Sequence, residues 1–335
     1  MSDYRDILII KAEPRIEVLQ ATCLLKTLSL KYPGERVVWV TSRRNQTLLQ
    51  GNPYISELYC CEAGGWIAAQ LNRRFKLVIS LETSQGMGDA ANWARGQEKY
   101  GLYRNNDGEV KLFNKGADKL SLWISTSGRE EELKELTYQK ILLKAAGCSE
   151  EIAAEMVFTL PEKAIEFACR WREERQIGGG LLAGIYLGYN PRLGKMCPDA
   201  RSVSFLAEEL IEELKVSTVI FAGPKEKGFF SDFMHSCPPG AADGGCLQSF
   251  TELTGVIGRC GVLFGLDSLG MQLALAMGKK VVVLEESAKQ QALELYGRGH
   301  IVLSDASEFK AGRKVLRFSP QEAFRAVKSL LDEMK

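Results

Sequence analysis

The sequence predicts an α/β protein of two domains, each built on a parallel sheet, with the two sheets facing a central cleft. Three observations predict this class. Short apolar runs alternate with helix-forming segments along the chain, which is the pattern of parallel strands joined by crossover helices. The apolar runs are unbroken, as in strands that are covered on both faces. The length of 335 residues suits two domains, which we expect to be Rossmann-like.

The first half of the chain is expected to form one such domain. Pro14 keeps the residues before it out of a helix, so Glu17 falls at the start of the next helix. The stretch between residues 81 and 128, where Gly, Asn and Asp are frequent, is expected to include working loops over the carboxyl edge of the first sheet. The predicted strands are Ile7–Ile10, Arg36–Thr41, Glu57–Cys61, Phe75–Ser80 and Tyr100–Tyr103, and the predicted helices are Val18–Tyr32, Arg44–Gln50 and Glu130–Ala146.

The second half repeats the alternation after a helix at Pro161–Arg175 and the glycine linker Gly178–Gly180. Capping boxes at Ser249 and Ser319 mark two further helix starts. The predicted strands are Leu181–Leu187, Thr218–Ala222, Gly261–Phe264 and Val281–Leu284, and the predicted helices include Phe205–Leu214, Lys225–Met234 and Leu269–Met277. The expected domains are 1–174 and 175–318, with a terminal helix, 319–335, packing back on the first domain.

Composition argues against several classes of protein. A net charge of +1 argues against a nucleic-acid footprint. With two histidines, and nine cysteines that form no CxxC pair, the chain lacks zinc-type spacing, and reduced cytoplasmic thiols are the expectation. No apolar run approaches the roughly 18 residues of a membrane span, and the N-terminus has no signal-peptide pattern. We therefore expect a cytoplasmic protein without a metal site.

Turns at the carboxyl ends of the second-half strands are the candidates for ligand binding. Asp267 and Ser268 open helix Leu269–Met277, and a helix N-terminus at this edge of a sheet suits a phosphate. A simple N-cap explains both residues equally well. The loop Gly188–Lys195 ends in a lysine that either neutralises a phosphate or is merely solvated. In the turn Gly223–Glu226, glycine allows close approach of the backbone to a ligand.

Several motifs follow one another in a recognisable order. Gly51-Asn52-Pro53 resembles a GNP step, and Lys195-Met196-Cys197-Pro198 resembles a K-x-W-P motif with cysteine in place of tryptophan. The segment Asp267–Ala274 resembles a D-S-G-P-M-H-L-A signature. Together, over most of the chain, these motifs resemble glycosyltransferase family 9, the bacterial heptosyltransferases of lipopolysaccharide core synthesis, which have the GT-B fold.

The resemblance implies inverting transfer of heptose or a related sugar to a lipopolysaccharide-type or other cell-surface glycan. The donor would be a nucleotide-diphosphate sugar, with an ADP-sugar favoured, and no metal or other cofactor would be required. Glu17 matches the aspartate that acts as the catalytic base in the first, acceptor-binding domain. The matching donor-binding positions in the second domain are Gly188, Lys195, Glu226, Asp267, Ser268, Gly270 and Gln272. The implied partners are the sugar nucleotide and a glycan or glycolipid, which allows peripheral contact with the inner face of the cytoplasmic membrane.

The sequence departs from the family pattern at several positions, so other functions are also considered. Ile16 and Leu269 replace glycines, Gln272 replaces a histidine, and Glu285-Glu286 stand where a Gly-Pro-Thr loop is usual. Glu17 itself also suits the first helical turn as an acidic residue with no catalytic role. The alternatives are an inactive or repurposed relative that binds a sugar nucleotide or a protein partner, and another GT-B enzyme such as a sugar-nucleotide epimerase.

Overall fold

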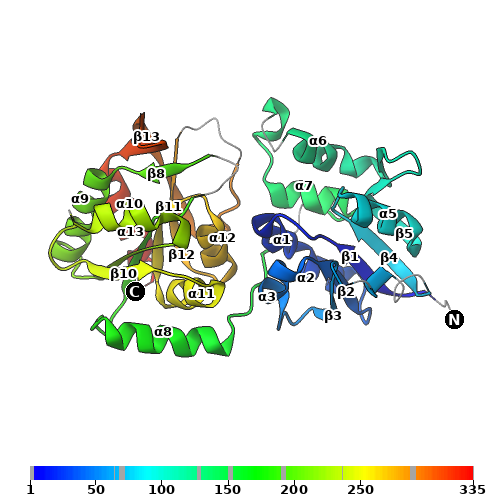
Figure 1. Ribbon diagram of the computed structural model, residues 1–335, viewed down its shortest axis with the longest axis horizontal. Coiled ribbons are helices and arrows are strands. Elements are labelled where there is room, and N and C mark those ends of the chain that lie inside the picture. The colour runs from blue at the N-terminus through cyan, green and yellow to red at the C-terminus, as the bar shows by residue number, and fades with distance from the viewer. Residues whose placement is uncertain are drawn as a thin grey trace. The chain divides into compact units, whose positions relative to one another are not determined.

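The computed structural model describes residues 4–63, 65–67, 72–126, 130–149, 154–189, 194–235, 237–286 and 292–334. The chain divides into two compact units (Figure 1). The first unit comprises Met1–Thr159 and Gln291–Glu294, and the second comprises Leu160–Gln290 and Leu295–Lys335. Each unit is a sheet covered by helices, as the alternating pattern predicts.

The sheet of the first unit has the strand order β3-β2-β1-β4-β5-β6. All neighbouring strands are parallel except β5 and β6. The strands are β1 (Arg5–Ile10), β2 (Val37–Thr41), β3 (Ile55–Cys60), β4 (Arg74–Ser80), β5 (Arg95–Arg104) and β6 (Val110–Leu112). The α-helices are α1 (Arg15–Ala21), α2 (Cys23–Lys31), α3 (Gln46–Leu49), α5 (Gln85–Trp93), α6 (Asp118–Thr126) and α7 (Tyr138–Ala145).

The described part of the stretch 81–128 includes short loops, as expected, and also α5, α6 and the strands β5 and β6. One sequence expectation for the first unit is wrong. The continuous helix expected over Glu130–Ala146 is absent: a short 3₁₀ turn at Glu131–Leu133 precedes α7, which begins only at Tyr138. Thr137 caps α7 by accepting a hydrogen bond from the backbone N–H of Lys140, which fixes the later start.

The sheet of the second unit has the strand order β10-β9-β7-β11-β12-β13-β14-β8. Only the β13–β14 pair is antiparallel. The strands are β7 (Leu182–Tyr186), β8 (Met196–Pro198), β9 (Ser217–Ala222), β10 (Ala242–Cys246), β11 (Val262–Leu266), β12 (Lys280–Glu285), β13 (Gly299–Lys310) and β14 (Arg313–Phe318). The α-helices are α8 (Glu162–Glu174), α9 (Ala200–Glu212), α10 (Lys227–Met234), α11 (Phe250–Arg259), α12 (Leu269–Ala276) and α13 (Pro320–Asp332).

Helices cover both faces of this second sheet. Alternate strand residues such as Ile185, Phe264 and Leu284 form one core cluster with apolar side chains of α9, α10 and α13. Successive residues of a strand point to opposite faces, so the residues between these belong to the other face. That face is covered by α12, which contacts both β11 and β12 and also packs against α11.

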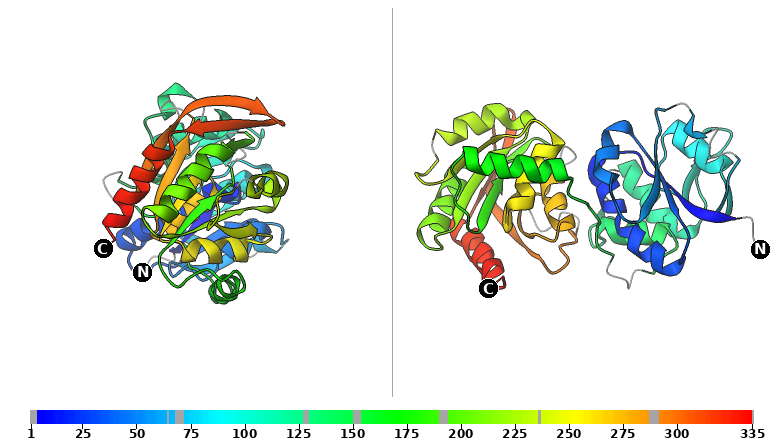
Figure 2. Two further views of the ribbon diagram at one scale, coloured as in Figure 1. Left: turned by 90° about the vertical axis from the view of Figure 1, so that its left-hand side faces the viewer. Right: turned by 90° about the horizontal axis from the view of Figure 1, so that it is seen from below.

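The domain boundaries differ from the sequence expectation in two respects. The division falls at Thr159–Leu160 and not at residue 174, because α8 packs against α11 and so belongs to the second unit. The terminal helix α13 belongs to the second unit. Its buried residues Ala323, Val327 and Leu330 lie in the core of the second sheet, alongside which the helix runs in Figure 2.

No helix within the described ranges combines the length and the apolar character that a membrane crossing requires.

Candidate functional site

In the first unit, the topological switch point lies between the adjacent strands β1 and β4. From β1 the chain continues to β2 toward one end of the sheet, and from β4 it continues to β5 toward the other end. In open parallel sheets, ligands bind at the carboxyl ends of the strands beside such a point. Here the loop after β1 begins at Lys11, and the loop after β4 begins at Leu81. Glu82 ties the two loops together, because its Oε2 accepts hydrogen bonds from the backbone N–H groups of Ala12 (3.2 Å) and Glu13 (3.1 Å).

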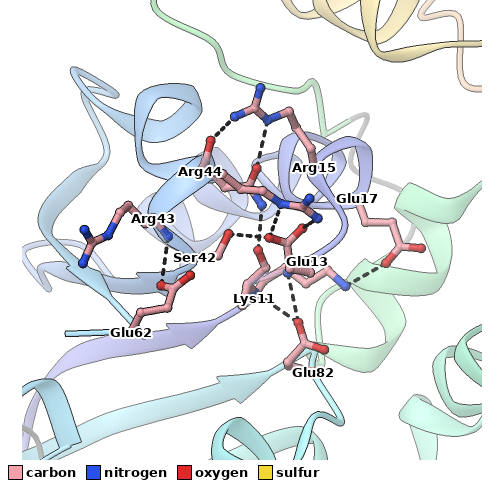
Figure 3. A network of polar contacts seen from close by, with 11 residues as sticks. Lys11, Glu13, Arg15, Glu17, Ser42, Arg43, Arg44, Glu62 and Glu82 are labelled. Carbon is pink, nitrogen blue, oxygen red and sulfur yellow. Dashed lines mark hydrogen bonds and ion pairs between the residues drawn. The ribbon is translucent and has the colours of Figure 1, made fainter. Parts of the chain in front are cut away.

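Glu17 lies in the first turn of α1, directly above this edge, as the sequence predicts. Its Oε2 is 2.7 Å from Lys11 Nζ, and the two side chains are only 3% and 2% exposed. Its Oε1 accepts a hydrogen bond of 2.9 Å from the indole N–H of Trp123 on α6. Lys11 also donates to the carbonyl of Leu81 at 3.3 Å, and Figure 3 shows the Lys11–Glu17 contact. The carboxylate is thus held by donors from two separate elements, the loop after β1 and helix α6.

Sequence reasoning missed the partners of Glu17. The signal for Lys11 was present: a lysine directly after four apolar strand residues, Ile7–Ile10, at the carboxyl end of the first strand. Such a charge enters the sheet edge and requires a partner there. Trp123 lies in the stretch that the composition indicates as loop, so no sequence signal placed it near Glu17.

A second acid on the same loop, Glu13, has a different environment. It accepts a hydrogen bond of 2.5 Å from the Ser42 hydroxyl and forms an ion pair with Arg44 (Figure 3). Burial alone would raise the pKa of Glu13, but the hydrogen bonds from Arg44 and Ser42 outweigh it and lower the pKa. Glu13 is therefore a weaker base than an ordinary glutamate.

The second unit has its switch point between β7 and β11. Ser268, after β11, is the N-cap of α12, because its hydroxyl accepts a hydrogen bond from the N–H of Met271 at 3.4 Å. Asp267 has a separate contact, since its Oδ1 accepts a hydrogen bond of 3.0 Å from Gln272 Nε2. Ser268 is therefore the helix cap, and Asp267 is held by Gln272.

The ring of Tyr186, at the end of β7, explains two of the predicted glycines. A Cβ at Gly188 would lie 2.2 Å from the Tyr186 Cζ, and a Cβ at Gly270 would lie 2.5 Å from its Cε1. Both positions therefore require glycine to make room for this ring. Burial, together with the charge of Glu226, raises the pKa of the Tyr186 phenol, which stays protonated at neutral pH. Sequence reasoning placed Tyr186 inside a strand and missed it.

Glu226 and Arg313 approach each other at the same edge. Glu226 is 5% exposed, and burial raises the pKa of its carboxyl, an effect that the positive charge of Arg313 partly offsets. The Arg313 Nη2 donates a hydrogen bond of 3.3 Å to the carbonyl of Lys225. The Arg313 Nη1 is buried and has no hydrogen-bond partner within the described residues. Arg313 is therefore a positive group with an unused donor, and no sequence motif pointed to it.

Lys195 immediately precedes β8 and is exposed. Its carbonyl accepts a hydrogen bond of 2.9 Å from the N–H of Lys314, which places it beside the start of β14. Because β14 and β8 run antiparallel to β13, their first residues lie at the carboxyl edge of the other strands. Lys195 and Arg313 therefore bring positive charge to the same edge as Glu226. Cys197 is 1% exposed within β8, and burial raises the pKa of its thiol to about 11, so it packs as an inert side chain.

The structure therefore collects the predicted residues at two sheet edges. Glu17 lies at the edge of the first sheet. Those of the second unit lie at its carboxyl edge: Gly188, Lys195, Glu226, Asp267, Ser268, Gly270 and Gln272.

Comparison with solved structures decides the fold. The glycosyltransferase family 9 protein of Veillonella parvula superposes with a TM-score of 0.72, at 16% identity, over 99% of this chain and 98% of that one. The fold is GT-B. The E. coli ADP-heptose lipopolysaccharide heptosyltransferase II gives a TM-score of 0.69 at 14% identity, covering 98% of this chain and 100% of that one. This confirms the resemblance predicted from the motifs at the level of the fold.

The similarity also extends beyond transferases. The UDP-GlcNAc 2-epimerase of Neisseria meningitidis gives a TM-score of 0.50 at 13% identity, over 98% of this chain and 91% of that one. No protein-family model matches the sequence, and no curated protein does either. Function must therefore be argued from the residues at the two sheet edges.

Proposed function

We propose that the protein is a glycosyltransferase that moves a sugar, heptose or a related one, from a nucleotide-diphosphate donor to a hydroxyl of a lipopolysaccharide-type or other cell-surface glycan. The observation that carries this proposal is the carboxylate of Glu17, fixed at the switch point of the first sheet by Lys11 and Trp123. The family motifs, met in order along the chain, and the GT-B fold support it.

In the proposed reaction the acceptor hydroxyl loses its proton to Glu17 while its oxygen bonds to the anomeric carbon. The bond from that carbon to the diphosphate oxygen breaks, and the nucleoside diphosphate leaves with the electron pair. Attack opposite the leaving group inverts the anomeric configuration. Lys11 and Trp123 fix the orientation of the Glu17 carboxylate, which proton transfer requires.

The second unit is proposed to bind the donor. Lys195 and Arg313 would oppose the negative charge that grows on the leaving diphosphate, so that no metal is required. Glu226 would accept hydrogen bonds from the ribose. An ADP-sugar is favoured, since the E. coli relative is described as an ADP-heptose enzyme. The activity would be cytoplasmic, at the inner face of the membrane where the acceptor is a glycolipid.

A second candidate function rests on the burial of Glu17. A carboxylate that is 3% exposed and already ion-paired also serves as a purely structural group. The protein would then bind a sugar nucleotide or a protein partner without transfer.

Thermal-shift measurements with ADP-, UDP- and GDP-sugars test the donor proposal first. We expect one nucleotide, at 100 times its Kd, to stabilise the protein by about 2.7 kcal/mol, which is a rise of several degrees in Tm. Stabilisation by none of the three series would contradict both the transferase and the sugar-nucleotide-binding alternative. Binding without release of nucleoside diphosphate, in the presence of truncated lipopolysaccharide cores, would favour the alternative.

A further inference from the structure

Two polar side chains at the carboxyl edge of the second sheet face a common point beside Gly223. Tyr186 is the last residue of β7, and Glu226 ends the short 3₁₀ turn that follows the adjacent strand β9. A Cβ built on Gly223 would lie 2.8 Å from Glu226 Oε2 and 3.5 Å from the Tyr186 hydroxyl oxygen. The two oxygens are therefore separated by no more than the sum of these two distances.

Both side chains are buried, yet neither has a side-chain hydrogen-bond partner. Tyr186 is 7% exposed and Glu226 is 5% exposed. Among the described residues, the Tyr186 hydroxyl forms no hydrogen bond, and no side chain donates to or ion-pairs with Glu226. The charge of Arg313 and two backbone N–H groups only partly offset the effect of burial on the Glu226 carboxyl. Buried polar groups in this state carry a free-energy penalty that a bound ligand can remove.

Packing of the ring sets the position of the Tyr186 hydroxyl. Gly188 and Gly270 leave room for the ring, and the ring of Phe221 lies against it with 5.3 Å between the centroids. Burial keeps the phenol protonated at neutral pH, because it raises the pKa of the hydroxyl. Tyr186 therefore places a hydrogen-bond donor at a fixed position beside the acceptor Glu226.

A hydroxyl group of a ligand would satisfy both side chains at once. It donates to the Glu226 carboxylate and accepts from the Tyr186 phenol. At about 2.8 Å from each oxygen, one hydroxyl spans a separation of up to about 5.6 Å, and two adjacent hydroxyls span more. A phosphate only accepts hydrogen bonds and would be repelled by Glu226, and an ammonium has no acceptor for the phenol proton.

We propose that Tyr186 is a specificity-determining residue of the nucleotide site, where its hydroxyl donates to a ribose hydroxyl that in turn donates to Glu226. This inference rests on the proposed function and goes beyond it, because there Glu226 alone contacts the ribose. The ribose is the favoured source of the hydroxyl, since an acidic residue near a strand end takes this role in nucleotide-binding α/β folds. Removing one ribose hydroxyl would leave these buried groups unpaired, so the site would select ribonucleotides over deoxyribonucleotides.

Calorimetry on the full chain with nucleoside diphosphates tests this inference. The probes are ADP, UDP and GDP, together with the 2′-deoxy, 3′-deoxy and glucose-linked forms of whichever binds most tightly. They are titrated into the wild type, Tyr186→Phe and the control Tyr296→Phe. Tyr296 precedes β13 at the opposite, amino edge of the sheet. The Tyr186 hydroxyl has no hydrogen bond to lose, so Tyr186→Phe should keep the Tm of the wild type.

We expect the wild type to bind the ribonucleotide at least about tenfold more tightly than one of its two deoxy forms. Tyr186→Phe should lose about tenfold in affinity for the ribonucleotide and less than about twofold for that deoxy form, because the same hydrogen bond cannot be lost twice. A purely structural role of Tyr186 would lower both affinities equally. Tyr296→Phe should keep the wild-type ratio.

The outcomes separate this inference from the proposed function. Equal wild-type affinities for the ribose and deoxyribose forms, or an equal loss for both in Tyr186→Phe, would overturn the inference and leave the donor site in place. A loss in Tyr186→Phe that is confined to the glucose-linked form would assign the hydroxyl to the transferred sugar and overturn the ribose assignment. Binding of none of the nucleotides would overturn the donor site, and this inference with it.

Discussion

The Lys11–Glu17 ion pair predicts a large and specific effect on stability. Both side chains are almost fully buried, with 2.7 Å between Lys11 Nζ and Glu17 Oε2. Removing one member of a buried pair leaves the other charge uncompensated and costs about 3–5 kcal/mol. Lys11→Met leaves a buried carboxylate, and Glu17→Gln leaves a buried ammonium beside an amide. Each variant should therefore lose about 3–5 kcal/mol of unfolding free energy.

The double variant Lys11→Met/Glu17→Gln should lose much less than the sum of the two single variants. Replacing a whole buried pair by neutral groups of similar size is often close to neutral, and the amide introduced by Glu17→Gln still offers an acceptor oxygen to Trp123. We expect the double variant to cost no more than either single variant, which corresponds to a coupling energy of at least about 3 kcal/mol.

Urea denaturation, with the transition of the first unit followed in the full chain, measures these differences. The control is the partly exposed pair of Glu13 and Arg44, whose side chains are 34% and 66% exposed. Glu13→Gln should cost at most about 1 kcal/mol, because solvent screens such a pair. Additive single variants, or a Glu17→Gln cost no larger than that of Glu13→Gln, would refute the claim that the buried pair organises this loop.

Three further predictions concern the second unit. Folding raises the pKa of Glu285 from 4.5 to about 7, so protonation of this carboxyl favours the folded state at acid pH. The free energy of unfolding should therefore decline by roughly 3 kcal/mol from pH 4 to pH 8. Glu285→Gln should remove this decline from urea midpoints measured across the same pH range. Gly270→Ala should cost about 1–3 kcal/mol by overpacking the Tyr186 ring, and a calorimetric loss of the same size in a Tyr186→Leu background would contradict this explanation. Lys195→Ala, at an exposed position, should leave Tm unchanged and weaken binding of the nucleoside diphosphate about tenfold in calorimetry; unchanged affinity would remove Lys195 from the phosphate site.

Much of the fold follows from local patterns. Continuous apolar runs such as Ile7–Ile10 and Leu181–Leu187 predict buried parallel strands, and the cap at Ser319 predicts the start of α13. Where a helix packs is a tertiary property, so the sequence could not assign α8 and α13 to the second unit. Strand β13 is largely exposed and β14 is mostly half-buried, and their sequences lack the long apolar run that revealed the other strands.

Only part of the candidate site could be predicted from the sequence. Motif order placed Glu17, Lys195 and Asp267 at sheet edges, because the carboxyl ends of parallel strands gather there. The groups that set their chemistry come from distant segments: Trp123 contacts Glu17 across 106 residues of sequence, and Arg313 contacts the Lys225 carbonyl across 88. Such contacts depend on packing and leave no local pattern.

The central claim is that Glu17 takes the proton of the acceptor hydroxyl, and one comparison tests it most directly. Donor affinity and the rate of nucleoside diphosphate release are measured for the wild type, Glu17→Gln and the control Glu13→Gln, at a temperature where all three are folded. We predict that Glu17→Gln keeps donor affinity within about twofold and loses turnover by at least 10²-fold, while Glu13→Gln retains turnover. Turnover by folded Glu17→Gln at the wild-type rate would contradict the claim and place the base on another residue.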